Sequence, residues 1–108
     1  MWGIFLNTEK DNKELFQLAV EYVVSGTKAL VISPVTRLEV ELKDIKELHN
    51  TPEFLYGEKV RLCNHPERTG LIVEIRWHFR KKQYLYKVSV NGRIKSKRYY
   101  GEDLQKLE

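Results

Sequence analysis

The stretch Gly70-Leu71-Ile72-Val73-Glu74-Ile75-Arg76-Trp77-His78-Phe79 decides the fold that the sequence predicts, because apolar and polar residues alternate along it almost strictly. A period of two is typical of a strand with one face in a core. The buried face would hold Leu71, Val73, Ile75, Trp77 and Phe79. The solvent face would hold Ile72, Glu74, Arg76 and His78. The stretch is therefore predicted to be a half-buried strand.

Other strands are predicted on both sides of this one. Residues 56–62 precede it, separated by a polar loop, and residues 84–90 and 93–100 follow it. A four-residue loop over 80–83 would pair Phe79 with Tyr84, Trp77 with Tyr86 and Ile75 with Val88. Each of these pairs is apolar or aromatic, so the register is self-consistent. Strands in this order predict a small closed barrel.

The turn at Asn91-Gly92 decides the register of the last hairpin. A two-residue loop is favoured by this dipeptide, but it would set Lys95 beside Val88 and so mix solvent and core residues on one face. A three-residue loop with Gly92 as a bulge pairs Val88 with Ile94 instead. We therefore predict a bulged turn, with Lys87 opposite Lys95 on the solvent face.

The two halves of this 108-residue chain differ in charge more than the net charge of +4 indicates. Residues 1–54 carry six Lys and Arg against nine Asp and Glu (−3), whereas residues 55–108 carry thirteen against six (+7). Such asymmetry indicates association with polyanions, although surface cations also serve solubility. The residues predicted to contact nucleic acid are Arg76, Arg80, Lys81, Lys82, Lys87, Arg93, Lys95, Lys97 and, by stacking on a base, Tyr99.

The first half is predicted to contain a helix between strands. Asp11 and Glu14 have the spacing of a capping box, and the apolar residues that follow lie at helical spacing as far as the stop at Ser25-Gly26. Strands are expected over 2–6, 28–32 and 37–42, and a helical turn over 44–48. An alternating strand followed by an acidic, leucine-containing turn occurs at 38–48 and again at 95–107. We do not interpret this echo as a duplication, because the helix has no counterpart in the second half.

A family resemblance adds to this interpretation of the second half. Gly57-x-x-Val60-x-Leu62, followed by a polar loop and Gly70-Leu71-Ile72-Val73, resembles the opening of SH3-like small barrels of the KOW and Tudor type. Tyr99-Tyr100-Gly101-Glu102-Asp103-Leu104 resembles their closing strand and final turn. The resemblance covers about half of the chain. It implies a barrel of a kind that binds RNA, DNA, proline-rich peptides or methylated side chains.

The expected fold class is therefore α+β. A strand-helix-strand-strand unit over residues 1–50 would be followed by an SH3-like β-barrel over residues 55–108. Residues 50–52, Asn-Thr-Pro, have the composition of a link between them.

Other candidate sites have simpler explanations. The aromatic residues of the second half could form a cage for a methylated ammonium group, but alternation directs most of them inward. Cys63 and His65 have no paired ligand spacing, so neither a metal nor a cofactor is expected. The carboxylates Glu39 and Glu41 lie on a solvent face. Without a phosphate-binding loop or a nucleophile motif, the chain is not expected to be an enzyme.

The predicted function is that of a non-enzymatic binding module for RNA or DNA, acting through the basic face of the barrel. The alternative is a protein-interaction or assembly module, which would use the barrel or an apolar patch on the acidic half. No apolar run approaches the ~18 residues of a membrane helix, and one cysteine excludes an internal disulfide. A cytoplasmic location is therefore expected.

Overall fold

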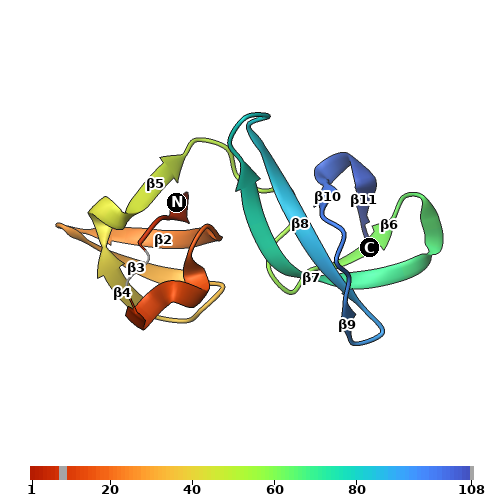
Figure 1. Ribbon diagram of the computed structural model, residues 1–108, viewed down its shortest axis with the longest axis horizontal. Coiled ribbons are helices and arrows are strands. Elements are labelled where there is room, and N and C mark those ends of the chain that lie inside the picture. The colour runs from red at the N-terminus through yellow and green to blue at the C-terminus, as the bar shows by residue number, and fades with distance from the viewer. Residues whose placement is uncertain (8–9, 108) are drawn as a thin grey trace. The chain divides into compact units, whose positions relative to one another are not determined.

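The chain folds into two compact units, Met1–Thr51 (unit 1) and Pro52–Glu108 (unit 2), each built on one antiparallel sheet (Figure 1). The structure is a computed structural model that describes residues 1–7 and 10–107. Within them there are strands and short 3-10 turns but no α-helix, so the fold is all-β and the predicted α+β class is wrong.

Unit 1 contains a five-stranded sheet in the order β4-β3-β2-β1-β5. Its core consists of side chains from four strands and the first 3-10 turn, namely Phe5, Leu15, Val20, Tyr22, Ala29, Val31 and Val40. The elements are β1 (Trp2–Phe5), η1 (Lys10–Leu15), β2 (Ala19–Ser25), β3 (Lys28–Ser33), β4 (Leu38–Glu41), η2 (Leu42–Asp44) and β5 (Ile45–Leu48).

Unit 2 contains a six-stranded sheet in the order β10-β8-β7-β6-β11, with β9 also paired to β8. Its fully buried side chains are apolar or aromatic and include Val60, Ile72, Ile75, Tyr86 and Val88. The elements are β6 (Lys59–Leu62), β7 (His65–His78), β8 (Gln83–Val90), β9 (Arg93–Ile94), β10 (Tyr99–Tyr100), η3 (Gly101–Asp103) and β11 (Leu104–Lys106).

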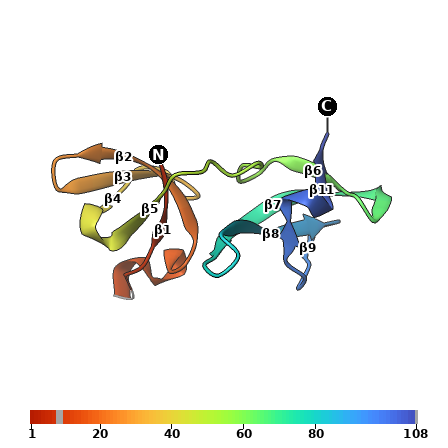
Figure 2. The same ribbon diagram turned by 90° about the horizontal axis from the view of Figure 1, so that it is seen from above.

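The two units share one topology. In each, the first strand pairs with both the second and the last, and a 3-10 turn precedes the last strand (Figure 2). The amide of Leu6, just after β1, donates to the carbonyl of Asp44 (2.8 Å), and the amide of Cys63, just after β6, donates to that of Asp103 (3.0 Å). The sequence echo between 38–48 and 95–107 falls on this shared strand, turn and strand, so it has a structural counterpart.

The predicted helix over residues 11–24 is replaced by a 3-10 turn and a strand. Asn12 has non-helical backbone angles and Gln17 has a positive φ of 66°, so no regular helix passes through them. The following residues are rich in β-branched and aromatic side chains, which favour a strand, and β2 gains ladder partners in β1 and β3. The Asp11 side chain, predicted to cap the helix, lies outside the described part of the structure.

Two shorter elements of the first half also differ from the prediction. Gly26 is not a helix stop, because Ser25 pairs with Lys28 across a two-residue hairpin turn in which Gly26 has a φ of 61°. The helical turn predicted over 44–48 is strand β5, and the 3-10 turn lies before it.

A β-bulge in β7 breaks the predicted alternation. The register shifts between Ile72 and Glu74, so that Val73 is an extra residue without a partner in β8. Ile72 is buried, whereas Leu71 and Val73 are 44% and 39% exposed. The prediction that Leu71 and Val73 point into the core is therefore wrong. The bulge shifts the alternation by one residue, so interior residues have even numbers before it and odd numbers after it.

The hairpin between β7 and β8 is displaced from its predicted register. His78 pairs with Gln83, Trp77 with Tyr84 and Ile75 with Tyr86, so the four-residue loop spans 79–82 instead of 80–83. Phe79, predicted to be internal, lies in this loop and is 46% exposed.

The hairpin at Asn91-Gly92 has the two-residue turn that the prediction rejected. Val90 pairs with Arg93, and both turn residues have positive φ (53° and 78°), as a type I′ turn requires. The twist match between this turn and the flanking strands outweighs the cost of placing Lys95 on the core side. The chain then leaves the sheet, and β10 rejoins it with Tyr99 opposite Tyr86.

Candidate nucleic-acid interface

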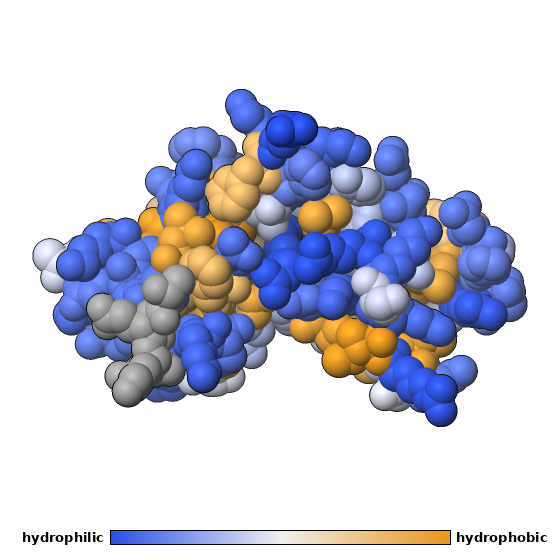
Figure 3. All heavy atoms as spheres, viewed as in Figure 1, coloured by the Kyte–Doolittle hydropathy of each residue, from blue (hydrophilic) through white to orange (hydrophobic). Residues whose placement is uncertain are grey.

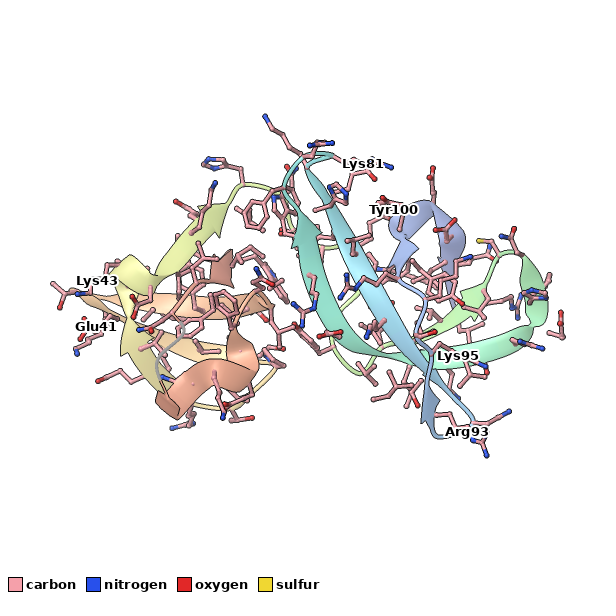
Figure 4. The ribbon with its side chains drawn as sticks, viewed as in Figure 1. Glu41, Lys43, Lys81, Arg93, Lys95 and Tyr100 are labelled. Atoms are coloured by element: carbon pink, nitrogen blue, oxygen red, sulfur yellow. The ribbon has the colours of Figure 1, made fainter. Side chains whose placement is uncertain are left out.

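The nine predicted nucleic-acid contacts do not form one face of unit 2. Arg80, Lys81 and Lys82 lie in the loop at one end of β8, and Arg93 follows the turn at its other end. The eight residues of β8 span roughly 23 Å at about 3.3 Å per residue. Figure 4 shows Lys81 beside Tyr100 at one end and Lys95 and Arg93 toward the other. The cations therefore divide into separate groups.

On the outer face of the sheet, Glu74 compensates two of the predicted cations. Its carboxylate accepts from Arg76 Nε (2.9 Å), lies 2.7 Å from Arg76 Nη2 and 3.8 Å from Lys87 Nζ. Lys87 pairs with Glu74 in β7. On the other side of β8, Lys95 lies opposite Val88, so the predicted Lys87–Lys95 pair is wrong. The three side chains together carry one net positive charge, which leaves this part of the surface weakly basic.

The β7–β8 loop carries a second group. Arg80, Lys81 and Lys82 are exposed, and the ammonium group of Lys81 lies 5.1 Å from the centre of the Tyr100 ring. His78 holds the loop, because its Nδ1 accepts from the Lys81 amide (3.1 Å) and its carbonyl from the Lys82 amide (2.7 Å). These cations are accessible and lie outside the pocket that the third group lines.

A third group lines an open pocket of about 260 Å³, which we call the rim pocket. It lies where the end of β6, the β6–β7 turn, the link 95–98 and η3 meet. Three of the predicted residues, Lys95, Lys97 and Tyr99, line it. The remaining lining side chains are Leu62, Asn64, His65, Arg68, Ser96 and Asp103.

The type I′ turn explains why Lys95 reaches this pocket. The Lys95 amide donates to the carbonyl of Val88 (2.9 Å), so Lys95 lies opposite a residue that is fully buried. Residues opposite each other share a face of the sheet. Lys95 therefore starts on the core side of the sheet, and its side chain lines the rim pocket. The two-residue turn thus places Lys95 on the same face as the buried Val88, and this position brings Lys95 to the rim pocket.

Tyr99 presents an aromatic surface beside the cations. It is half-buried, and Lys97 Nζ lies 5.0 Å from the centre of its ring, a cation–π distance. Its partner in the sheet, Tyr86, is 1% exposed, and burial raises the pKa of Tyr86 to about 12. The Tyr86 hydroxyl accepts a hydrogen bond from the Glu53 amide (2.9 Å). This bond helps to fix β8, the strand that pairs with Tyr99 in β10.

One carboxylate, Asp103, also lines the pocket. Its Oδ2 accepts from the amide of Tyr100 (2.9 Å), so it serves the turn η3. Arg68, Lys95 and Lys97 outnumber it, so the pocket has a net positive charge and suits an anion.

Arg68, His65 and Asn64 were missed at the sequence level because residues 63–69 read as a loop. The structure extends β7 back to His65 and folds this segment against the link that holds Lys95. Residues 63–69 lack the apolar alternation that predicts a strand, so no sequence signal indicated them.

The other candidate sites have structural roles or no partners. Trp77 packs edge to face on Tyr84 (4.8 Å) and Phe54 on Tyr86 (5.3 Å), as core aromatic pairs do. Among the described residues, no group of three His, Cys, Asp or Glu side chains could hold a metal ion. Cys63 is a free, exposed thiol. No helix of the described chain is long and apolar enough to cross a membrane.

Fold and site together define a protein of two β-sheet units of equal topology, with a basic, aromatic pocket in the second. The chain belongs to DUF6960, a family of unknown function, whose model matches residues 30–105. The match begins within β3 of unit 1 and ends within β11 of unit 2, so the family includes parts of both units. No curated protein matches the chain.

Proposed function

We propose that this protein is a non-enzymatic nucleic-acid-binding module and that the rim pocket of unit 2 binds backbone phosphate. The observation that carries the proposal is the convergence of Arg68, Lys95 and Lys97 on one pocket beside an aromatic ring. Lys and Arg contacts to phosphate position a nucleic acid without reading its sequence. The accessible cations Arg80, Lys81, Lys82 and Arg93 would add weaker, longer-range attraction.

The fold supports the same proposal. A meander of strands, a 3-10 turn and a last strand that pairs with the first agree with the SH3-like barrel that the sequence of unit 2 resembles. Barrels of that kind include nucleic-acid binders. The cytoplasm, where an exposed thiol such as Cys63 stays reduced, is the proposed location.

Fluorescence anisotropy with labelled RNA and DNA at several salt concentrations tests the proposal. We expect Lys95→Gln with Lys97→Gln to weaken binding and to lower the slope of log K against log salt by about two, about one for each lost phosphate contact. The matched control is Lys59→Gln with Lys106→Gln, which removes the same charge from exposed positions of unit 2 outside the pocket.

Two results would contradict the proposal. One is the absence of salt-sensitive binding of the wild-type protein to either nucleic acid at low ionic strength. The other is an equal loss of affinity in both double variants, because net charge alone would then account for the binding.

A protein-interaction role is the second candidate, and exposed apolar side chains favour it. Val23 in β2 is 54% exposed and pairs with Leu30 in β3, and Ile32 on the same strand is 40% exposed. Apolar patches also stand among the hydrophilic side chains in Figure 3. Light scattering after size exclusion, combined with affinity capture from source cells, tests this role: a monomer that retains no protein argues against it.

A further inference from the structure

The size of the rim pocket limits what it can enclose. At about 260 Å³ it lies just below the range of roughly 300–1,000 Å³ that is typical of small-molecule sites. The pocket therefore suits one compact group, such as a single base or phosphate. A duplex offers its phosphates and base edges, but its base faces are stacked and can be reached only by flipping a nucleotide out.

The Tyr99 ring provides a surface for a base face. It is half-buried, lines the pocket and has the ammonium group of Lys97 5.0 Å from its centre. Lys97 itself is exposed, so its side chain can turn from the ring to a phosphate when a base takes its place. Stacking of bases on aromatic side chains is the common device of proteins that bind single strands.

Neutral polar groups complete the pocket. The Asn64 amide and the Ser96 hydroxyl both line it, and within the described part of the chain neither side chain has a hydrogen-bond partner. An amide offers two donors and an acceptor, and a hydroxyl offers one donor and an acceptor, which suits them to the edge of an unpaired base.

We infer that the rim pocket binds one unpaired nucleotide, with the base against Tyr99 and the phosphate among Arg68, Lys95 and Lys97. The ligand class is therefore single-stranded nucleic acid. The inference rests on the proposed function and specifies which form of nucleic acid the same pocket takes.

Three labelled probes separate base contacts from phosphate contacts in the wild-type protein. They are a single-stranded oligonucleotide, a duplex of the same length and an abasic single strand that keeps the phosphates but lacks the bases. We expect the ordinary single strand to bind roughly fivefold to a hundredfold more tightly than the abasic strand. We expect the duplex to bind more weakly than the ordinary strand.

A pair of variants localises the base contact. Tyr99→Leu should lower affinity for the ordinary single strand to that of the abasic strand and leave the salt slope unchanged, since it removes no charge. Tyr100→Leu is the matched control, because Tyr100 lies on the opposite face of the same short strand, across from Leu85. Tyr99→Phe should keep wild-type affinity.

The outcomes distinguish this inference from the proposed function. Equal affinity for the ordinary and abasic strands, or tighter binding of the duplex, overturns the single-nucleotide pocket but leaves salt-sensitive phosphate binding standing. Should Tyr99→Leu fail to fold, the three probes on the wild-type protein still decide. Loss of all salt-sensitive binding would overturn both.

Discussion

The same corner of the fold is closed in unit 1 and open in unit 2. Asn7 and Asn64 both stand two residues after a first strand ends, and Asp44 and Asp103 both end a 3-10 turn. In unit 1 the Asn7 amide donates to Asp44 Oδ2 (2.8 Å) and bridges the corner. In unit 2 Asp103 Oδ2 accepts from Tyr100 instead, and Asn64 lines the rim pocket. The aspartate at this corner thus has a side-chain amide as its partner in unit 1 and a backbone amide in unit 2.

Charge separates the two units further. Met1–Thr51 carries six Lys and Arg against eight Asp and Glu (−2), and Pro52–Glu108 carries thirteen against seven (+6). Equal topology therefore does not imply equal ligands, because function lies in the side chains grafted on a fold. Unit 1 thus has the topology of unit 2 but a net negative charge.

The largest effect is expected from truncating equivalent core residues in the two units. Phe5 pairs with Ile45 and Leu62 with Leu104, at matching positions. Phe5→Ala should cost about 3–5 kcal/mol and Leu62→Ala about 2–5 kcal/mol, through lost burial and cavity formation. In two-dimensional NMR spectra each variant should lose the signals of its own unit. Loss of all signals together in either variant would show that the units unfold as one.

A smaller effect is expected at alkaline pH, where unit 2 should lose more stability than unit 1. Burial raises the pKa of Tyr56, Tyr84 and Tyr86 in unit 2, whereas in unit 1 burial and then the Glu47 charge raise the pKa of Tyr22. A raised pKa in the folded state means that stability is complete below the unfolded value and falls as pH rises through the folded value.

For Tyr86 the window runs from pH 10.0 to about 12, and the loss is roughly 2 to 3 kcal/mol. Urea unfolding followed at a series of pH values measures it. Tyr86→Phe should flatten the pH dependence of unit 2 and leave that of unit 1 unchanged. An identical slope in wild type and variant would refute the assignment to Tyr86.

The smallest effect concerns the two aspartates at the compared corner. Asp44→Asn and Asp103→Asn each weaken one charged hydrogen bond and should cost about 1 kcal/mol in urea unfolding. Only Asp103→Asn should also strengthen nucleic-acid binding, because it removes a negative charge from the rim pocket. Equal effects of both substitutions on affinity would mean that the two corners do not differ in function.

Strands with clear alternation could be predicted from the sequence, as β6 and β8 illustrate. The stretch from Leu15 to Val24 could not, because its apolar residues satisfy both the helical and the extended period, and pairing with β1 and β3 decided between them. The face of Leu71 and Val73 was also out of reach, since it depends on a bulge at Val73 that no residue type indicates.

Three of the residues that line the candidate site could be predicted from the sequence, but their grouping could not. The charge pattern predicts Lys95 and Lys97, and the ring beside Lys97 predicts Tyr99. The same pattern groups them with Arg76 and Lys87, which the structure pairs with Glu74. The two-residue turn at Asn91-Gly92 separates them. The dipeptide favours this turn, whereas an apolar core face favours the bulged turn. Binding sites are where such a local rule and the pattern of the core come into conflict.

The bulge at Val73 has a practical consequence for comparing members of the family. Upstream of it the residues facing the interior occupy even-numbered positions such as Ile72, and downstream they occupy odd-numbered ones such as Ile75 and Trp77. A relative with a regular strand here would be one residue shorter. An alignment of such a relative needs its gap at Val73, since a gap placed in a neighbouring loop would match interior residues of one protein with surface residues of the other.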